Sequence, residues 1–292
     1  MQNQKSIGHL LAGITIFIWG TTFIATKILL QTFLPIEILF LRFVLGFFAL
    51  LLADWHHLHG ATVKQHLVFA AAGFCGVTLY YLLENIALTD TLASNVGVII
   101  SASPFFTVIF SRIGGKIRLN VLFFIGFVIA FCGIGLIRLG DGFSLHPVGD
   151  LLALLAALAW SAYSLLTHKI ASYGYPVIQT TRIVFLYGLL FMLPVLPWMG
   201  FRFALARLLQ PVYALNLLFL GLGASALCFL TWGCAVKILG AVKTSIYIYM
   251  VPAVTVIASV LILHEPFTIR TACGVGFTLA GLLISERGQT AR

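Results

Sequence analysis

Residues 35–53 read PIEILFLRFVLGFFALLLA, an almost wholly apolar run whose charged side chains are Glu37 and Arg42. A run of about this length is what an α-helix needs to cross the hydrocarbon core of a bilayer. Comparable runs fill the rest of the chain, at 8–30, 67–88, 92–111, 119–139, 149–168, 178–198, 212–236, 241–263 and 269–285. The sequence therefore predicts an all-α integral membrane bundle of ten transmembrane helices.

The composition supports a membrane protein. Only 9% of the 292 residues are charged, 61% are hydrophobic, and the mean hydropathy is +1.09. A soluble globule of this length needs far more polar surface. Almost nothing remains for a soluble domain, so the function is expected within the bilayer.

The net charge of +9 is better explained by membrane topology than by nucleic-acid binding, because the basic residues are scattered near the helix ends. If the N-terminus is cytoplasmic, the cytoplasmic side holds Lys5, Lys64, Arg112, Lys116, Arg118, Lys169, Lys237, Lys243, Arg287 and Arg292. The opposite side holds Arg138, Arg202, Arg207 and Arg270. This bias predicts a multi-pass protein of the cell inner membrane with both termini cytoplasmic.

The two halves of the chain resemble each other. Matching residues 148 positions apart are Pro104 and Pro252, Ser111 and Ser259, Gly126 and Gly274, and Gly133 and Gly281. Trp19 matches Trp160 and Arg42 matches Arg182 at slightly shorter offsets. We expect one repeat at 1–140 and a second at 141–292. With five helices each, the second repeat enters the membrane from the opposite side, and inverted repeats are typical of carriers that open alternately to the two sides.

Polar and aromatic residues share one face in each first helix of the repeats. These are Thr15, Trp19, Thr22 and Thr26 in the first half and Trp160, Tyr163, Ser164 and Thr167 in the second. Hydroxyl groups bring no advantage against lipid, so both faces are expected to point inward. They either line a cavity or pack closely, with each hydroxyl bonded to its own helix.

Proline occurs within two further spans. Ser94, Gly97, Ser101 and Pro104 share a face of the fourth span, and Ser245, Tyr249 and Pro252 take matched places in the ninth. Proline frees a carbonyl one turn earlier, which predicts a bend in each helix. The bend borders a cavity or is purely structural.

Glu84 is the acid placed deepest in an apolar run. Intramembrane carboxylates are costly and commonly functional, so Glu84 is a candidate to bind a substrate amino group or to carry a coupling proton. The alternative is a structural salt bridge to Lys27 or Arg42. Arg182 joins those two as a structural charge, and Trp232 occupies the position that matches Glu84.

Motifs for other chemistry do not occur. The sequence contains no Walker loop, serine elbow or HExxH motif, and its five cysteines form no CxxC pair. His56, His57 and His59 fall in a polar loop, where solvation is the simpler reading. We expect no metal and no cofactor. A membrane-embedded enzyme and a passive channel remain as rival classes.

Several short motifs resemble those of the EamA-like branch of the drug/metabolite transporter superfamily. They are Trp19-Gly20-Thr21-Thr22-Phe23, Leu41-Arg42-Phe43, Asn85-Ile86-Ala87-Leu88, Thr91-Leu92-Ala93-Ser94, Met250-Val251-Pro252 and His264-Glu265-Pro266. The resemblance covers nearly the whole chain and implies alternating access through a cavity between the halves, with export of amino acids, their derivatives or other metabolites. The chain departs from the pattern where Ile117 replaces the counterpart of Glu265.

These observations predict a secondary carrier of small polar metabolites, with the lipid bilayer as its surroundings. The predicted substrate-binding residues are Trp19, Thr22, Tyr80, Glu84, Ser101, Trp160, Tyr163, Trp232 and Tyr249. Carriers of nucleotide-sugars or lipids are the alternatives within the family. The sequence leaves the coupling ion and the oligomeric state open.

Overall fold

The protein is a bundle of helices in the computed structural model, which describes residues 2–113, 117–138, 147–202, 205–239, 244, 246–265, 267–287 and 289–291. Lys116, Lys243, Ser245, Pro266 and Arg292, which entered the predictions above, lie outside the described residues. The first half contains α1 (Gln2–Leu29), α2 (Pro35–Ala53), α3 (Val63–Gly73), η1 (Phe74–Leu79), α4 (Tyr80–Asp90), α5 (Ala93–Ile100), α6 (Ser103–Ile113), β1 (Ile117–Leu119) and α7 (Val121–Arg138).

The second half follows a similar order of spans, but its strand comes after the last helix, whereas β1 comes before α7. It contains α8 (Pro147–Ala171), α9 (Val177–Met192), the short α10 (Val195–Trp198) and α11 (Leu205–Leu208), α12 (Pro211–Leu218), η2 (Phe219–Leu227), α13 (Cys228–Leu239), η3 (Ile246–Met250), α15 (Val251–Ala258), η4 (Ser259–Leu263), α16 (Ile269–Arg287) and β2 (Gln289–Ala291). The strands β1 and β2 form a short antiparallel pair, Ile117 opposite Ala291.

Within the described residues, six helices are long and apolar enough to cross a membrane: 4–29, 35–53, 63–90, 93–111, 147–171 and 211–239. Four shorter apolar helices, at 121–133, 177–192, 247–263 and 269–285, occupy the remaining predicted spans. Large apolar side chains such as Phe17, Leu52 and Leu261 are exposed on the outside of the bundle. The chain is therefore a multi-pass membrane protein.

The second helix shows how the sequence sets a helix boundary. Pro35 occupies the first turn of α2, where a missing N–H is tolerated. Two residues later, Glu37 Oε2 accepts a hydrogen bond of 2.8 Å from the backbone N–H of Leu34. The predicted bounds, 35–53, coincide with those of α2.

Other spans are not α-helical throughout, and two of these irregularities lie just before the prolines that predicted a bend. The fourth span is interrupted at Ser101 and Ala102, one turn before Pro104, and the ninth changes from the 3₁₀ turn η3 to α15 just before Pro252. The third and eighth spans contain the π-helical stretches η1 and η2, which lie at matching positions of the two halves. Such π-helical stretches are rare and often occur at functional sites.

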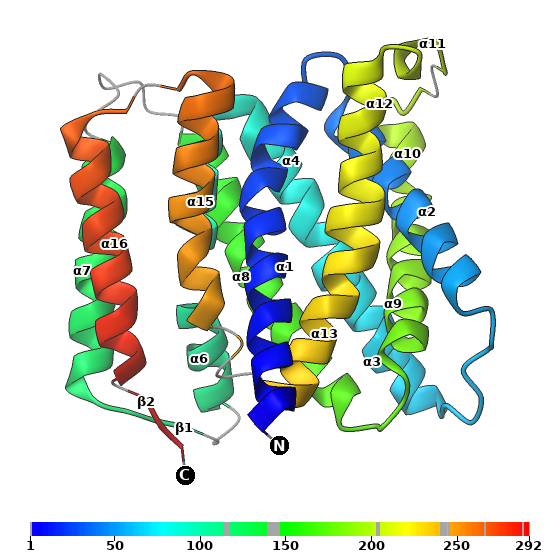
Figure 1. Cartoon of the computed structure of the whole chain (residues 1–292), viewed down its shortest axis with the longest axis horizontal. Helices are drawn as coiled ribbons and strands as arrows, with labels where there is room; N and C mark the ends of the chain where they lie inside the picture. Colours follow the sequence, from blue (N-terminus) through cyan, green and yellow to red (C-terminus); the bar gives the residue numbers. More distant parts are fainter. Residues whose placement is uncertain are drawn as a thin grey trace.

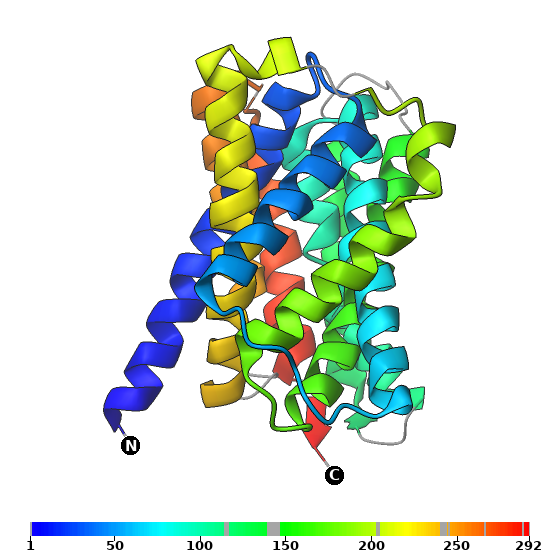
Figure 2. The ribbon, with the colours of Figure 1, turned by 90° about the vertical axis from the view of Figure 1, so that its right-hand side faces the viewer.

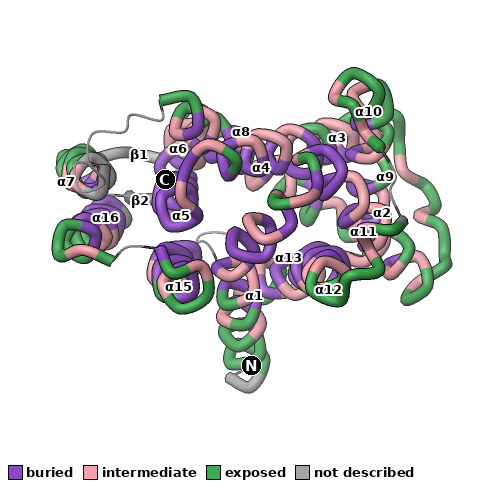
Figure 3. Tube along the Cα trace, turned by 90° about the horizontal axis from the view of Figure 1, so that it is seen from above, coloured by how far each residue is buried: buried purple, intermediate pink, exposed green. Residues whose placement is uncertain are grey.

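Figure 1 shows α7 and α16 packed side by side at one edge of the bundle, with both chain termini at the same end. We call that end proximal and the opposite end, which carries residues 30–34, 91–92 and 264–265, distal. Figure 2 shows the helices running between these two ends. Seen from above in Figure 3, the buried residues gather where α1, α4, α5, α8 and α13 meet. This is the part of the bundle in which a site is enclosed.

Candidate functional site

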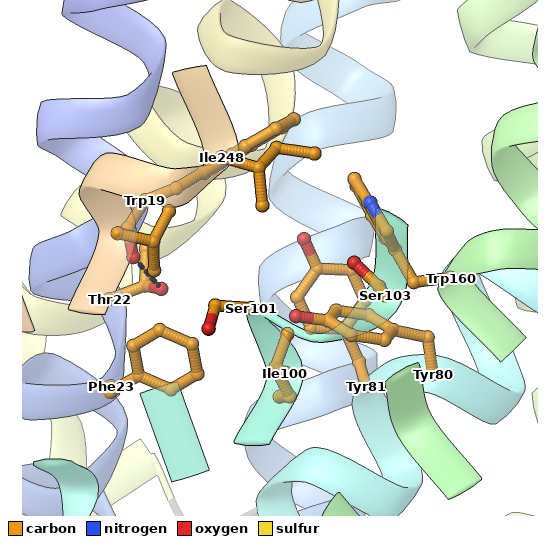
Figure 4. A pocket seen from close by; sticks show the side chains of 11 residues that line it. Trp19, Thr22, Phe23, Tyr80, Tyr81, Ile100, Ser101, Ser103, Trp160 and Ile248 are labelled. Carbon is orange, nitrogen blue, oxygen red and sulfur yellow. Dashed lines mark hydrogen bonds between the residues drawn. The ribbon is translucent and has the colours of Figure 1, made fainter. Parts of the chain in front are cut away.

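A pocket lies in the middle of the bundle, and we call it the chamber. It is lined by Trp19, Thr22, Phe23, Tyr80, Tyr81, Ile100, Ser101, Ser103, Trp160, Ile248 and Val251. These residues come from α1, α4, the interruption between α5 and α6, α8, and the junction of η3 with α15. Figure 4 shows their side chains converging from both halves of the chain, so neither half contains the chamber alone.

Aromatic rings form one wall of the chamber. The ring of Trp19 meets that of Trp160 edge-on, with centroids 5.3 Å apart, and Tyr80 lies 4.9 Å from Trp160 on the other side. The indole N–H of Trp19 donates to the carbonyl of Ala224 at 3.0 Å, which fixes the ring against η2. A rigid aromatic surface of this kind contacts an apolar group without a large loss of side-chain entropy.

Two of the predicted aromatic residues lie behind this wall. Trp232 packs 5.2 Å from Trp19, and Tyr163 packs 5.1 Å from Trp160. A side chain at Gly76, in η1, would collide with the Tyr163 ring, so the glycine makes room for it. Trp232 and Tyr163 therefore support the lining residues, whereas Tyr249 packs with a separate cluster around Ala102 and Phe105.

The predicted hydroxyl groups of the chamber bond to their own helices. Thr22 Oγ1 donates to the carbonyl of Trp19 at 2.7 Å, as Figure 4 shows. Ser101 Oγ donates to the carbonyl of Val98 at 2.6 Å. Thr22 and Ser101 therefore line the chamber and also bond to their own helices. Each hydroxyl oxygen can still accept a hydrogen bond from a substrate.

Ser103 is a lining residue that the sequence did not single out. Its side chain is buried, and its Oγ has no hydrogen-bond partner in the part of the chain that the structure describes. Its backbone carbonyl accepts a hydrogen bond of 2.7 Å from Ser161 in α8, which anchors the start of α6. The signal available in the sequence was its place next to Pro104.

Five other lining residues were not predicted from the sequence, and their sequence signals are weaker than that of Ser103. They are Phe23, Tyr81, Ile100, Ile248 and Val251. Four of these are apolar residues within apolar spans, so only the packing of helices from both halves distinguishes them. Tyr81 follows Tyr80 directly, but lies in a different direction around α4.

Glu84 lies one turn beyond Tyr80 in α4 and is almost completely buried, with 1% of its surface exposed. Its Oε1 has no hydrogen-bond partner among the described residues, and no ion pair joins it to Lys27 or Arg42 there. Lys27 instead donates to the carbonyls of Leu88 and Thr91, at 2.7 and 2.6 Å, and so caps the end of α4. The salt bridge considered from the sequence is absent from this part of the chain.

Arg42 is a second buried charged residue, and it lies near Glu84. Its side chain is wholly buried, and its Nε donates to Ser225 Oγ in η2 at 3.1 Å. The guanidinium carbon lies 4.3 Å from the centre of the Tyr81 ring, and neither terminal nitrogen has a hydrogen-bond partner among the described residues. Arg42 and Glu84 interact electrostatically behind the tyrosine wall of the chamber.

Arg182, the residue that matches Arg42, lies near the proximal end. Its two terminal nitrogens donate to the backbone carbonyls of Asp54 and His56, which follow the last turn of α2. Asp54 also accepts hydrogen bonds from Gln179 and His56. Arg182 thus binds the backbone that follows α2.

A family comparison now bears on this geometry. The model of the EamA-like transporter family matches residues 6–139 and again residues 147–286. The chain belongs to this family. The same family model thus matches the chain twice, which agrees with the repeat read from the sequence and with the matching π-helical stretches.

Similar proteins come from archaea and bacteria. An uncharacterized transporter of Archaeoglobus fulgidus is 28% identical over 98% of this chain and 99% of its own. A protein of Streptantibioticus cattleyicolor named a probable terminal-alkyne amino-acid exporter is 26% identical, covering 77% of this chain and 74% of its own. A solved crystal structure has the same fold, with a TM-score of 0.68 and 19% identity over 96% of both chains.

Proposed function

We propose that this EamA-like transporter is a secondary carrier that exports small polar metabolites, amino acids or their derivatives, across the inner membrane by alternating access. The observation that carries this proposal is the chamber, which is enclosed by residues of both halves and combines aromatic rings with hydroxyl groups. Sites of this composition bind molecules that have an apolar part and a few polar groups. The exporter name of the Streptantibioticus relative favours amino acids within that class.

The proposed mechanism requires ten spans in two inverted repeats, at 1–140 and 141–292. The packing of α7 on α16 supports inversion. Gly126 lies against the backbone of Gly281, and Gly133 lies against that of Gly274. The contacts run in opposite order along two helices that hold matching places in the repeats, so these helices are antiparallel. An axis in the membrane plane relates halves of this kind.

The orientation is part of the proposal. We place both termini in the cytoplasm, because the proximal end then carries most of the basic residues. The distal end faces the other side of the membrane. The two ends of the chamber consequently open to the two compartments between which the substrate moves.

The chamber residues receive separate roles. Trp19, Tyr80 and Trp160 contact the apolar part of the substrate, and Thr22, Ser101 and Ser103 offer hydroxyl oxygens to its polar groups. Trp232 and Tyr163 support the aromatic residues from behind, and Tyr249 packs in the cluster around Ala102 and Phe105. Glu84 is outside the chamber lining but interacts with Tyr80, which belongs to it, and we assign to Glu84 either the substrate amino group or the coupling proton.

Purified protein in liposomes tests the function. We expect saturable transport and counterflow for amino acids or their derivatives, which a passive channel does not show. Trp160→Leu should raise KM about tenfold by removing a rigid aromatic contact. The matched control is Trp198→Leu, because Trp198 is 89% exposed and remote from the chamber. Non-saturable flux, or equal KM values for the two variants, contradicts the proposal.

The role of Glu84 needs a separate experiment. If Glu84 carries the coupling proton, Glu84→Gln abolishes transport driven by a pH gradient but retains exchange of substrate against substrate. If it binds the amino group, the same variant loses amino acids and retains substrates without an amino group. Unchanged transport and pH dependence remove Glu84 from the mechanism.

A further inference from the structure

A glutamate of the second half binds the first turn of a helix of the first half at the distal end. Glu265 Oε1 accepts a hydrogen bond of 2.9 Å from the backbone N–H of Ala93, the first residue of α5. Glu265 Oε2 accepts from the N–H and the Oγ of Ser94, at 3.2 and 2.7 Å. A buried carboxylate thus caps the positive end of a helix from the other half, which is a strong type of hydrogen bonding.

The backbone before Glu265 is held in an unusual conformation. His264 ends η4 with φ 54° and ψ 33°, and it is the residue other than glycine with positive φ in the described part of the chain. The left-handed conformation costs a non-glycine residue of order 1 kcal/mol or more and persists only where the surroundings enforce it. It turns the chain so that the Glu265 side chain reaches α5.

The helix that Glu265 caps leads directly to the chamber. The last residue of α5 is Ile100, and Ser101 follows it, so both lining residues move with α5. The same helix packs tightly on the second half farther along, where a Cβ at Gly97 would lie within 3.0 Å of Thr255. Thr255 Oγ1 in turn donates to the carbonyl of Gly20 in α1 at 2.8 Å.

Contacts between the two halves therefore extend from the distal end of the bundle inward to the chamber. Glu265 holds the beginning of α5, and Thr255 of α15 holds its middle and α1. Lys27, which caps the preceding helix α4, also interacts electrostatically with Glu265. A substrate leaving at this end has to pass between these helices.

The first half has no carboxylate at the matching position. Ile117 stands there, in β1, and its backbone pairs with Ala291 of β2 at the proximal end. A carboxylate can release three bonds at once when it is neutralised or displaced, whereas a strand pair is joined through the backbone alone. The contacts that join the two halves at the two ends are consequently of different kinds.

We propose that Glu265 is a positioning residue that latches the distal end: it fastens α5 to the second half, and the chamber opens at this end only when the Glu265 contacts to Ala93 and Ser94 are released. This inference rests on the proposed alternating access, but not on the identity of the substrate.

Cysteine labelling from each side of the membrane tests the latch. The reporter is Ile100→Cys, introduced after replacement of Cys75, Cys132, Cys228, Cys234 and Cys273, and probed with a membrane-impermeant methanethiosulfonate in vesicles of known orientation. With Glu265 present, we expect labelling from the proximal face. Glu265→Gln keeps the size of the side chain but loses its charge, and should raise the rate from the distal face about tenfold while lowering the proximal rate.

Two further variants keep the test specific. Glu37→Gln is the matched control, because Glu37 is also a buried carboxylate at the distal end but bonds to Leu34 and Arg207 instead of α5. It should leave the sidedness unchanged. Ser94→Ala removes one of the three bonds and should shift labelling in the same direction by a smaller factor, with no additional effect in the Glu265→Gln background.

The outcomes separate the latch from a general loss of stability and from the proposed transport. Unchanged sidedness in Glu265→Gln overturns the latch, and so does faster labelling from both faces alike. A shift from the proximal to the distal face supports it, even if none of the tested amino acids is transported. In that case the substrate proposal fails and the latch stands.

Discussion

Arg42 and Arg182 hold matching places in the two halves but have entirely different surroundings. Arg182 gives its terminal nitrogens to two backbone carbonyls at the end of α2. Arg42 stacks on Tyr81 and bonds through Nε to Ser225, and its terminal nitrogens have no hydrogen-bond partner among the described residues, although the buried Glu84 is near. The two halves share the course of the backbone, whereas the partners of each arginine depend on the residues around it.

The physical reason lies in the cost of a buried charge. Backbone carbonyls at a helix end need donors, so an arginine that reaches them satisfies both partners. An arginine in the interior needs a compensating negative charge or hydrogen-bond acceptors, because desolvation is expensive there. Arg42 has a carboxylate as its neighbour, and this carboxylate is the one deeply buried acid beside the chamber wall in the described part of the chain.

The largest expected effect is that of Arg42→Met. This variant leaves the carboxylate of Glu84 buried without its positive neighbour, and we expect it to lower the free energy of unfolding by about 3–5 kcal/mol. The double variant Arg42→Met/Glu84→Gln removes both charges and should recover most of this loss. Unfolding by SDS in mixed micelles measures both. A double variant as unstable as the single one would show that the two residues are independent.

Arg182→Met changes the matching arginine of the second half. It removes two charged hydrogen bonds to carbonyls that water can reach, so we expect a loss of about 2–3 kcal/mol. Glu84→Gln should give no recovery, because Glu84 belongs to the environment of Arg42. The same unfolding assay applies. Equal recovery of both arginine variants by Glu84→Gln would show that Glu84 is not specifically coupled to Arg42.

Glycine substitutions examine what the repeat does conserve, the close approach of matching helices. A Cβ at Gly281 would collide with the backbone of Ala130 in α7, so Gly281→Ala should cost about 1–3 kcal/mol through strain. Gly276, on the same helix, has nothing within 4 Å, and Gly276→Ala should be neutral or stabilise by up to about 1 kcal/mol. Similar unfolding curves for the two variants would show that α7 and α16 separate easily.

The sequence carries much of this arrangement because the bilayer restricts the fold. Apolar runs locate helices where no water satisfies the backbone, and the predicted run 35–53 is the observed α2. Spacing also placed Trp19 and Thr22 on one face, and the repeat extended that face to Trp160. All three line the chamber. These inferences needed only local periodicity and one internal comparison.

Other features depend on packing between the halves and have no local signal. Helical spacing gives a face but not a depth, which is why Tyr163 and Trp232 lie behind the wall instead of in it. Ser103 and Ile248 enter the chamber because their helices are interrupted there. The partner of Glu265 is a helix end far away in the sequence, and no spacing rule connects them.

The smallest expected effect concerns Asp54, whose backbone carbonyl binds Arg182. Hydrogen bonds from Gln179 and from His56 lower the pKa of the Asp54 carboxyl from 3.8 to about 2. A lowered carboxyl pKa contributes stability above its unfolded value, and that contribution is lost as the pH falls from about 3.8 through about 2. Residues 54–62 should therefore become more susceptible to pepsin over this range, relative to a free peptide of the same sequence.

The size of this change depends on Arg182. Its bonds go to backbone carbonyls, which do not titrate, so the loop stays attached at pH 2 and opens less than it does in Arg182→Met. Asp54→Asn should make cleavage independent of pH, because the titrating group is gone. If cleavage of Asp54→Asn still rises as the pH falls, another acid controls the opening of residues 54–62. The attachment of this loop by Arg182 would then depend on a neighbouring carboxylate, as the environment of Arg42 does.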